Sequence, residues 1–293
     1  MNAAVTEPVA EVRAQVGAAA RVLAAAGVAS ARHDAEALAA HLLGVPRAAL
    51  LLCREVLDAS QYDLLVARRA AREPLQHIMG RAAFRHLELA VGPGVFVPRP
   101  ETELVVDAAL AAIADDSRPL VVDLCSGSGA IALAIAVERP DAVVHAVEVS
   151  GDAVPWLQRN VDQCAPDVTL TVADVRDPRL LAELDGRVDL VVSNPPYLPT
   201  GARAALDPEV GDHDPALALF AGADGLALIP AVAAAAWRLL RPGGSLAVEH
   251  GDDQGAAVPA ELRLQGFADV TDHRDLAGRD RFATATRPDG HRS

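Results

Sequence analysis

One short run of the chain, "SNPPY" at residues 193–197, combines residue types whose spacing could do chemistry. Prolines cannot donate to a strand ladder and they fix φ, so this run should end a buried strand and begin a stiff loop. The Asn194 side-chain oxygen and the Pro195 carbonyl are two acceptors one residue apart, and Tyr197 adds a ring. Such a set could take both N–H groups of a planar amide while the ring stacks on it. A strand-ending loop with a packing tyrosine is the purely structural alternative.

A second candidate is the glycine-containing run "DLCSGSGAIA", which follows an apolar stretch. Gly127 and Gly129 open a helix there and let backbone N–H groups approach a ligand. The G-x-G-x-x-A spacing fits a dinucleotide site and a nucleoside site alike, and plain strand-to-helix turns also contain such glycines. Asp123 separates the two ligands, because a carboxylate at the strand end repels a pyrophosphate and attracts the ammonium of a methionine-type ligand.

Two further carboxylates follow the next apolar runs. Glu148 ends the second run and suits a ribose diol. Asp174, after the third run, could accept a hydrogen bond from an exocyclic adenine amine. A solvated loop carboxylate is an equally good interpretation of Asp174.

Five short apolar runs alternate with helical segments in the second part of the chain. Such alternation predicts a doubly wound α/β domain with a mostly parallel, Rossmann-like sheet covered on both faces. Ligands of these sheets lie beyond the carboxyl ends of the strands, where the candidate residues fall. The runs are "LVVDL" at Leu120, "VVHAVE" at Val143, "LTV" at Leu170, "VDLVVS" at Val188 and "SLAVEH" at Ser245.

The first part of the chain, residues 1–84, has helical periodicity and predicts a small helical domain. Apolar residues recur at helical spacing up to Gly27, and Ser30 is expected to cap a second helix that ends at Gly44. A third helix could begin at Pro46.

A further helix is expected to begin with a capping box formed by Ser60 and Asp63 and to run to "ARRAARE" before Pro74. Over residues 87–91 every second residue is apolar. This alternation is interrupted at "GPG" and continues at residues 95–97. This alternation predicts a β-hairpin linker over residues 85–98, which leaves residues 99–293 for the α/β domain.

Composition excludes several classes of protein. The net charge of -14, from 26 Lys+Arg and 40 Asp+Glu in 293 residues, disfavours binding to nucleic-acid phosphates, and no basic stripe interrupts it. Cys53, Cys125 and Cys164 are far apart, which indicates a reducing cytoplasm. No basic region precedes an apolar core at the start, and the longest apolar run, residues 226–237, is short. We therefore expect no signal peptide and no membrane span.

The chain resembles the S-adenosylmethionine-dependent protein glutamine methyltransferases of the HemK/PrmC type, which modify peptide-chain release factors. The likeness covers nearly all of the sequence and is most specific in "PRPETE". Cys125 departs from it, because the family often has glycine there, and we expect a small shift in the turn. The motifs that carry the resemblance are "EPLQHIMG" at Glu73, "VPRPETE" at Val97, "DLCSGSGA" at Asp123, "SNPPY" at Ser193, "LLRPGGSLAVEHG" at Leu239 and "DLAGRDRF" at Asp275.

The resemblance implies methyl transfer from S-adenosyl-L-methionine to the glutamine amide of the Gly-Gly-Gln loop in release factors. The helical domain is expected to dock the release factor, and a monomer is expected. The implied catalytic residues are Asn194, Pro195, Pro196 and Tyr197. The implied cofactor-binding residues are Asp123, Cys125, Ser126, Gly127, Ser128, Gly129, Glu148, Asp174, Val175 and Asn194.

Other functions remain open from the sequence. "NPPY" also serves exocyclic nitrogens of nucleic-acid bases, but such an enzyme needs a basic groove or a target-recognition insertion. Another protein glutamine, for example in a ribosomal protein, is a second possible target, and a non-enzymatic module that kept the cofactor pocket is a third class. The acidic runs "GDHD" at Gly211 and "EHGDD" at Glu249 lack metal-site spacing, so no metal is expected.

Overall fold

The computed structural model describes residues 7–289, and the chain divides into two compact units. One unit contains the chain up to Arg81 together with Leu206–His213. The other contains Ala82–Ala205 and the residues from Asp214 onward. The boundary expected after residue 84 falls close to this division. No sequence pattern indicated that the short segment Leu206–His213 would belong to the first unit.

The first unit is helical, as its periodicity predicts. Apolar side chains of its helices, among them Val12, Leu23 and Leu38, are buried together. Tyr62 lies in this core and donates its hydroxyl hydrogen bond to the Ala35 carbonyl at 2.7 Å. The elements are α1 (Glu7–Ala25), α2 (Ala31–Leu43), η1 (Arg47–Leu52), α3 (Ala59–Ala70), α4 (Leu75–Met79) and α8 (Pro208–Gly211).

Two helix starts differ from expectation. Ser30 does precede α2, but its hydroxyl donates to the Asp34 carboxylate at 2.8 Å and caps no backbone N–H. The capping box of Ser60 and Asp63 is wrong. Asp58 caps α3 instead, because its carboxylate accepts from the Ser60 backbone N–H at 2.9 Å, so the helix begins two residues earlier.

Ion pairs attach the short helix α8 to the first unit. The Glu209 carboxylate on α8 accepts from the Arg72 guanidinium at 2.7 and 2.5 Å and lies 2.8 Å from the Arg69 guanidinium. Arg69 also donates to the buried Asp34 at 2.8 Å. Each guanidinium therefore has a carboxylate partner, and the segment brought in from later in the chain completes the set.

A two-stranded sheet joins β1 (Arg81–Phe84) and β2 (Leu87–Ala90), so a hairpin is present. Its turn is formed by residues 85–86, where Arg85 has a left-handed φ of 50°. The expected pairing around "GPG" is wrong, because residues 91–98 form no strand. "GPG" packs on a helix instead: a Cβ on Gly92 would lie 2.5 Å from the Trp156 ring.

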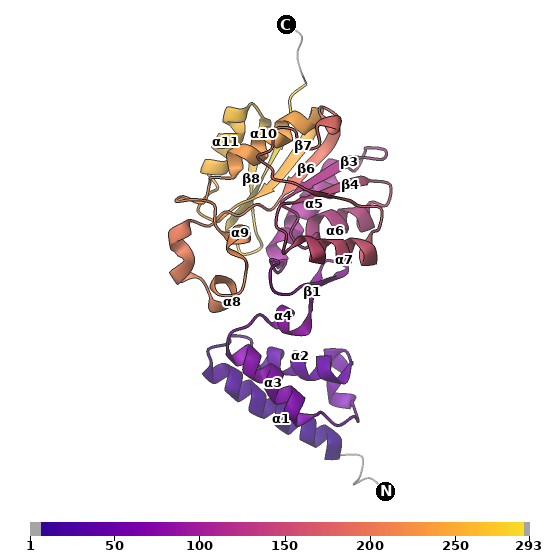
Figure 1. The fold of residues 1–293 in the computed structure, drawn as a ribbon, viewed down its shortest axis with the longest axis vertical. Helices are drawn as coiled ribbons and strands as arrows, with labels where there is room; N and C mark the ends of the chain where they lie inside the picture. Colours follow the sequence, from indigo (N-terminus) through magenta and orange to yellow (C-terminus); the bar gives the residue numbers. More distant parts are fainter. Residues whose placement is uncertain (1–6, 290–293) are drawn as a thin grey trace. The chain divides into compact units, whose positions relative to one another are not determined.

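The second unit is built on a seven-stranded sheet of order β5-β4-β3-β6-β7-β9-β8 (Figure 1). The strands from β5 to β7 pair in parallel, and β9 pairs antiparallel with both β7 and β8. The strands are β3 (Leu120–Leu124), β4 (Val143–Glu148), β5 (Thr169–Val172), β6 (Val188–Ser193), β7 (Leu240–Glu249), β8 (Ala268–Arg274) and β9 (Asp280–Thr286).

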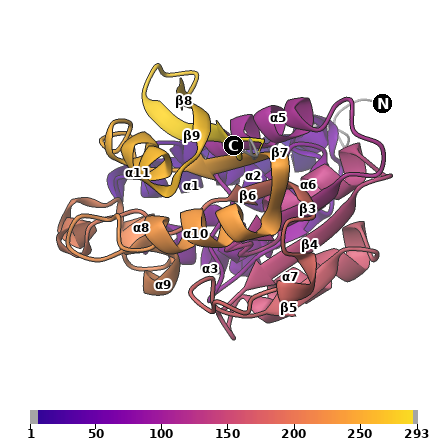
Figure 2. The ribbon, with the colours of Figure 1, turned by 90° about the horizontal axis from the view of Figure 1, so that it is seen from above.

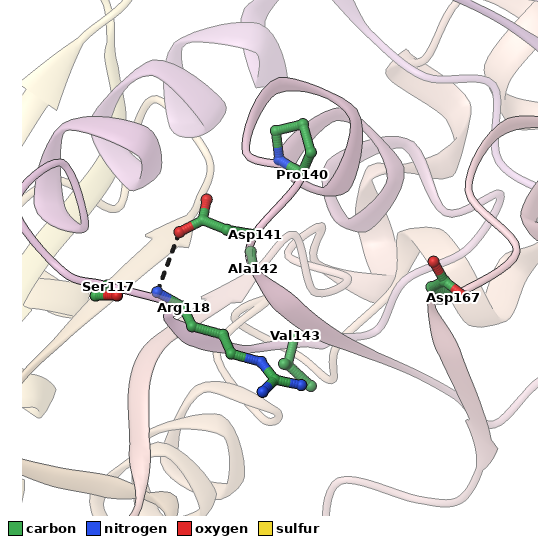
Figure 3. Close-up of a pocket in the computed structure, with 7 residues that line it drawn as sticks. All are labelled: Ser117, Arg118, Pro140, Asp141, Ala142, Val143 and Asp167. Atoms are coloured by element: carbon green, nitrogen blue, oxygen red, sulfur yellow. Dashed lines mark hydrogen bonds between the residues drawn. The ribbon is translucent and has the colours of Figure 1, made fainter.

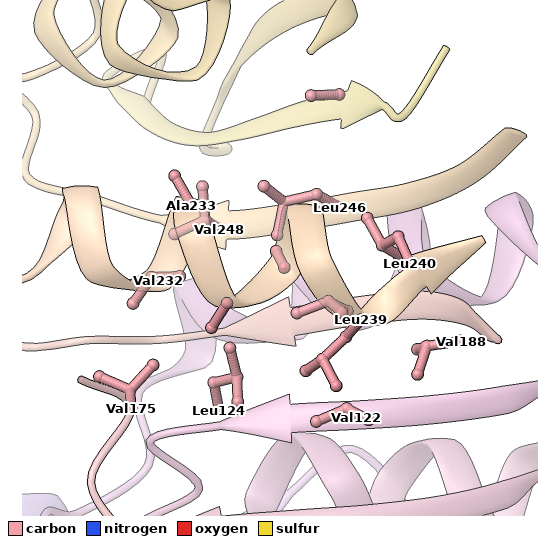
Figure 4. Close-up of a cluster of buried hydrophobic side chains, with 14 of the residues drawn as sticks. Val122, Leu124, Val175, Val188, Val232, Ala233, Leu239, Leu240, Leu246 and Val248 are labelled. Carbon is pink, nitrogen blue, oxygen red and sulfur yellow. The ribbon is translucent and has the colours of Figure 1, made fainter. Parts of the chain in front are cut away.

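Helices cover both faces of this sheet (Figure 2). On one face α5, α6 and α7 pack over Val121 of β3, and on the other α10 and α11 pack over Val122 (Figure 4). Val121 and Val122 face opposite sides because successive side chains of a β-strand point to opposite faces of the sheet. The helices are η2 (Pro100–Thr102), α5 (Glu103–Ala112), α6 (Ala130–Glu138), α7 (Val154–Cys164), η3 (Ala182–Leu184), η4 (Thr200–Ala205), α9 (Ala216–Leu219), α10 (Ile229–Leu239) and α11 (Ala257–Gln265).

All five predicted strands are present, which confirms the mostly parallel α/β fold. The antiparallel pair β8 and β9 was missed. β8 contains charged residues along its length and lies at the sheet edge with no buried residue, and β9 begins with Asp280 and Arg281 and then, after Phe282, alternates alanine with threonine, so no apolar run marks either strand. Among residues 7–289, no helix combines the length and the apolar composition that a membrane crossing requires.

Candidate functional site

Parallel pairing brings the predicted site residues to one edge of the sheet. Asp123 of β3 lies between Ala146 of β4 and Val192 of β6. The loops that follow these three strands therefore begin side by side, as expected at the carboxyl edge of a doubly wound sheet. Beyond β5, the Ala173 N–H donates to the Glu148 carbonyl at 3.1 Å, which adds the next loop to the group.

The glycine loop needs both of its glycines. Gly127 has a φ of 56°, and a Cβ built on it would meet nothing within 4 Å. Gly129 has a φ of 87°, and its Cβ would lie 2.6 Å from the Leu157 side chain. Gly127 therefore faces open space that a side chain would fill, whereas Gly129 allows α6 to begin close to α7.

The two serines of this loop are engaged with the protein itself. The Ser126 hydroxyl donates to the Asp123 carbonyl at 3.0 Å. The Ser128 carbonyl accepts from the Asn160 side chain at 2.9 Å. The same side-chain amide accepts from the Ala90 N–H and donates to the Ala90 carbonyl. Asn160 is fully buried and ties the glycine loop to the end of β2. Its role was not found from the sequence.

Cys125 occupies a position that favours glycine. Its φ of 64° is left-handed, a region that costs an L-residue about 1–2 kcal/mol. Burial raises the pKa of its thiol to about 12, and the neighbouring Glu148 and Asp123 carboxylates act in the same direction. The thiol is therefore protonated and unreactive at neutral pH.

Asp123, the carboxylate at the start of the glycine loop, is buried with one oxygen unpaired within residues 7–289. It is 1% exposed, and its Oδ2 accepts from the Ala132 N–H at 3.2 Å. Its Oδ1 has no hydrogen-bond partner among the described residues. Burial raises the pKa of Asp123 to about 7, against the opposing effect of the hydrogen bonds. A buried acceptor without a donor is costly, so it points to a ligand that supplies one.

Glu148 is nearly saturated by backbone donors. Its Oε1 accepts from the N–H groups of Val149 at 2.8 Å and Ser150 at 2.7 Å, and its Oε2 accepts from Gly127 at 2.7 Å. A carboxylate has about four acceptor positions, so about one remains on Oε2. Glu148 thus organises the loop as well as offering an acceptor to a ligand.

Asp174 and Val175 follow β5. The Asp174 carboxylate pairs with the Arg176 guanidinium at 2.6 Å and accepts from the Arg176 backbone N–H at 2.8 Å. The hydrogen bonds from Arg176 lower the pKa of Asp174. Val175 is buried in the core on the α10 face. Asp174 is thus ionised, and a ligand amine would share it with Arg176.

The loop after β6 begins just before the two prolines, where the strand ends as expected. The Ser193 hydroxyl donates to the Leu124 carbonyl at 2.7 Å, which joins the end of β6 to the end of β3. No described residue forms a cis peptide bond, so Pro195 and Pro196 are trans. No described residue donates to the Pro195 carbonyl or to the Asn194 side-chain oxygen. Both predicted acceptors are available.

Gln254 and Gly225 hold the backbone of Tyr197. The Gln254 amide donates to the Tyr197 carbonyl at 2.9 Å, and its oxygen accepts from the Gly251 N–H at 2.9 Å. A Cβ on Gly225 would overlap the Tyr197 carbonyl oxygen. The loop therefore depends on two residues distant in sequence that were not predicted.

Two more residues missed from the sequence touch this loop. The Asn194 side-chain amide donates to the Thr102 hydroxyl at 3.2 Å. The Tyr197 hydroxyl lies 3.4 Å from Oε1 of Glu249. Thr102 and Glu249 stand in "PRPETE" and "LAVEHG", motifs that carried the resemblance without a role for either residue.

A pocket of about 540 Å³ lies elsewhere on the second unit (Figure 3). Its lining residues precede β3, β4 and β5 or, in the case of Val143, begin β4, so it lies at the opposite edge of the sheet from the glycine loop. The Arg118 backbone N–H donates to the Asp141 carboxylate there at 3.0 Å. Within residues 7–289, no group of three or more His, Cys, Asp or Glu side chains is placed to hold a metal ion.

Comparisons with known proteins separate the same two parts. The family model described as PrmC N-terminal domain matches residues 16–80, and that described as Methyltransferase small domain matches residues 88–206. The fold of the hMettl16 catalytic domain, solved in complex with MAT2A 3'UTR hairpin 6, is similar at a TM-score of 0.54. The two sequences are 17% identical, and the structural match covers 76% of this chain and 81% of the hMettl16 chain. The likeness therefore concerns the fold alone.

Similar sequences span nearly the full chain and share the name release factor glutamine methyltransferase. The protein from Streptomyces coelicolor is 54% identical over 277 residues, which cover 94% of this chain and 97% of that protein. The protein from Mycolicibacterium smegmatis is 52% identical over 280 residues, which cover 94% of this chain and 97% of that protein. That from Mycobacterium tuberculosis is 48% identical over 282 residues, with 94% and 91% covered.

Proposed function

The chain belongs to the release factor glutamine methyltransferase family, and from this membership we propose that it methylates a glutamine side-chain nitrogen in peptide-chain release factors. The target is the glutamine of the Gly-Gly-Gln loop, and the methyl donor is S-adenosyl-L-methionine. The observation that carries the proposal is the meeting of a nucleoside-type glycine loop with an amide-binding "NPPY" loop at adjacent strand ends.

The residues at the end of β3 fit the cofactor. Oδ1 of Asp123 is a buried acceptor that lacks a donor, and an amino-acid ammonium supplies one together with a charge of the right sign. Gly127 leaves open space beside it. The free acceptor position of Glu148 suits a ribose hydroxyl. Asp174 would accept from the adenine amine, and the backbone beside Val175 would line the base.

When bound, S-adenosylmethionine supplies an electrophilic methyl carbon whose bond to sulfur breaks as the amide nitrogen attacks. The chain's own task is to orient that nitrogen, whose lone pair is delocalised into the carbonyl. The Asn194 side-chain oxygen and the Pro195 carbonyl each accept one amide N–H, which fixes the amide plane and aims the lone pair. Pro196 keeps the carbonyl in place, and Tyr197 stacks on the amide.

No strong base is required of the protein. The methylated nitrogen still carries both of its protons and is very acidic in that state, so it loses one of them to solvent. Acceptors that draw electron density through the N–H bonds also favour the pyramidal nitrogen of the transition state over the planar ground state.

Mass spectrometry of a release factor co-expressed with and without this protein tests the proposal. We expect a single added methyl group on the Gly-Gly-Gln glutamine only when the protein is present. Asn194→Ala should remove most of the methyl transfer and leave the affinity for S-adenosylhomocysteine within about threefold, because the lost contact is to the substrate. An unmodified glutamine, or equal loss of transfer and affinity, would contradict the assignment.

The helical unit has none of the strand-end loops, so we propose that it docks the release factor. An amide pocket recognises a carboxamide that every exposed glutamine carries, and selection of one glutamine needs contacts remote from the reacting atom. The unit exposes four large apolar side chains, and the three most exposed of them, Leu52, Val56 and Leu64, suit such a contact. The reaction would take place in the cytoplasm, where release factors act.

A further inference from the structure

His250, in the run "EHGDD", has no assigned role, although it is fully buried directly after β7. Both nitrogens of its ring have a partner. Nδ1 lies 2.8 Å from the Gly251 carbonyl oxygen, and Nε2 lies 2.8 Å from Oδ1 of Asp272 on β8. The ring therefore belongs to the interior of the second unit and connects the ends of two strands there.

The two partners decide how many protons the ring carries. A carbonyl oxygen and a carboxylate oxygen only accept hydrogen bonds, so each ring nitrogen has to donate one. A neutral imidazole has a hydrogen on one nitrogen alone and would turn a lone pair toward one of the two oxygens. Both bonds therefore require an extra proton. It belongs on His250, because imidazole is a stronger base than a carboxylate and Asp272 is partly exposed to solvent.

Other charged side chains of the surrounding elements are engaged elsewhere. Glu249, the residue before His250, points the other way, toward the Tyr197 hydroxyl. Asp252 and Asp253, in the loop that follows, are exposed to solvent. Asp272 is therefore the carboxylate that compensates the charge of the ring. On β8, β9 and α11, Arg274 bonds Asp280, Arg281 bonds Asp275, and Arg263 bonds the Val270 carbonyl.

The Gly251 peptide links this ring to the "NPPY" loop. Its carbonyl accepts from His250 and from the Gln254 N–H at 2.9 Å, which occupies both of its lone pairs. Its N–H donates to the Gln254 side-chain oxygen at 2.9 Å. The Gln254 NH₂ group then faces the Tyr197 carbonyl, to which it donates at 2.9 Å. Gln254 is buried, so all of these bonds lie inside the protein.

We propose that the doubly protonated His250 is a positioning residue that fixes the "NPPY" loop through Gly251 and Gln254. The inference rests on the proposed function, because this loop is the one that would bind the substrate amide. Loss of the second ring proton would turn a lone pair toward Gly251 or toward Asp272. One of the two bonds would then break, so the loop would lose support above the pH at which that proton leaves.

Nitrogen NMR of the full chain, labelled in its histidine rings, tests the protonation directly. At about pH 7.5 we expect both ring nitrogens of His250 to carry a hydrogen, and the spectrum of His250→Asn identifies which signal belongs to this residue. Asp272→Asn removes the negative charge, but its NH₂ group can donate to Nε2, so a neutral ring keeps both bonds. We expect one protonated ring nitrogen in this variant at the same pH.

Methyl transfer to a Gly-Gly-Gln peptide tests the link to the loop. Gln254→Glu still accepts from Gly251 but turns a carboxylate oxygen toward the Tyr197 carbonyl, so kcat should fall about 10- to 100-fold. S-adenosylhomocysteine affinity should stay within about threefold. In the parent, kcat should fall about tenfold over the pH range in which His250 loses its second ring proton. Asp272→Asn should be within about threefold of the parent at neutral pH and should lack this fall.

Asp269→Asn is the matched control, because it makes the same change at an exposed position of β8, and it should keep the parent's pH profile. A neutral His250 ring in the parent at about pH 7.5 would overturn the inference, and so would a pH profile of Asp272→Asn equal to that of the control. A purely structural role would lower kcat alike at every pH.

Should Asp272→Asn fail to fold, the parent decides by itself, since its ring proton and its activity must be lost over the same pH range. A parent protein that transfers no methyl to the peptide or to the intact factor would instead refute the proposed function, which the NMR measurement does not address.

Discussion

At the scale of single residues, the predicted site divides into groups that the fold leaves available and groups that it already uses. Asn194 and Pro195 keep acceptors without described donors, and Asp123 keeps one buried oxygen. Ser126 and Glu148 are largely occupied by the loop itself. Sequence patterns identify residue types at a site, but they do not tell whether a donor of the same chain has taken an acceptor first.

The pKa of Asp123 predicts how cofactor affinity depends on pH. Burial raises it to about 7, so below that value the carboxyl is increasingly neutral, while a ligand ammonium binds the ionised form. The affinity for S-adenosylhomocysteine, which has the same ammonium, should weaken about tenfold for each pH unit well below 7. Above this range the dependence should level off.

Titration calorimetry at several pH values and in buffers of different ionisation enthalpy measures both the affinity and the proton released. Asp123→Asn serves as the comparison. It should bind more weakly at pH 8 and should release no proton at pH 6. Identical pH profiles for the two proteins would assign the dependence to another group.

At the scale of elements, prediction succeeded where the signal was local. The five parallel strands are marked by apolar runs, and the turns after them contain glycine or proline. The contacts of Thr102 with Asn194 and of Gln254 with Tyr197 join positions far apart in the chain. Their pairing follows from the order of strands in the sheet, which no single run of residues encodes.

Gly225 offers a test of how rigid the "NPPY" loop must be. Its φ is 77°, and a Cβ added there would overlap the Tyr197 carbonyl oxygen, so Gly225→Ala must displace the loop. We expect methyl transfer to fall about 100-fold while S-adenosylhomocysteine still binds, because a shift of about 1 Å has effects of this size.

Gly201→Ala is the matched control, since a Cβ there meets nothing within 4 Å and its φ is not left-handed. It should retain parent activity. Activity in Gly225→Ala equal to that of the control would mean that the loop adapts without cost and that its position is not critical.

At the scale of the whole molecule, Glu209 links a late segment to the helical unit and should stabilise that unit. Burial opposes ionisation, but the hydrogen bonds from Arg72 and Arg69 outweigh it and lower the pKa of Glu209 from 4.5 to about 2. A carboxylate whose pKa is lowered by folding stabilises the folded state. This stabilisation is complete above about pH 4.5 and is lost as the pH falls toward 2.

Glu209→Gln should therefore lower the free energy of unfolding at pH 7 by about 1–3 kcal/mol, and the difference from the parent should shrink near pH 3. Urea denaturation at the two pH values measures it. Glu55→Gln, an exposed change in the same unit, should have no effect beyond about 0.5 kcal/mol. A Glu209→Gln effect as small as this control would show that the ion pairs do not hold α8.

A test of docking must leave this arrangement intact, because deletion of residues 1–84 would also strip the partners of Glu209. Replacing Leu52, Val56 and Leu64 by serine alters only exposed side chains. We expect activity on the intact release factor to fall at least about tenfold more than activity on a Gly-Gly-Gln peptide. Leu264→Ser, equally exposed on the other unit, is the control. Equal losses on both substrates would refute a docking role.

The chain passes between the two units three times, after Arg81, after Ala205 and after His213. During synthesis, the helices up to Arg81 leave the ribosome long before Glu209 is made. In the nascent helical unit, Arg72 therefore lacks its partner Glu209 until most of the sheet has also been translated. The last step in its maturation comes late, and a chain that stops short of α8 would yield a helical unit lacking one of its own parts.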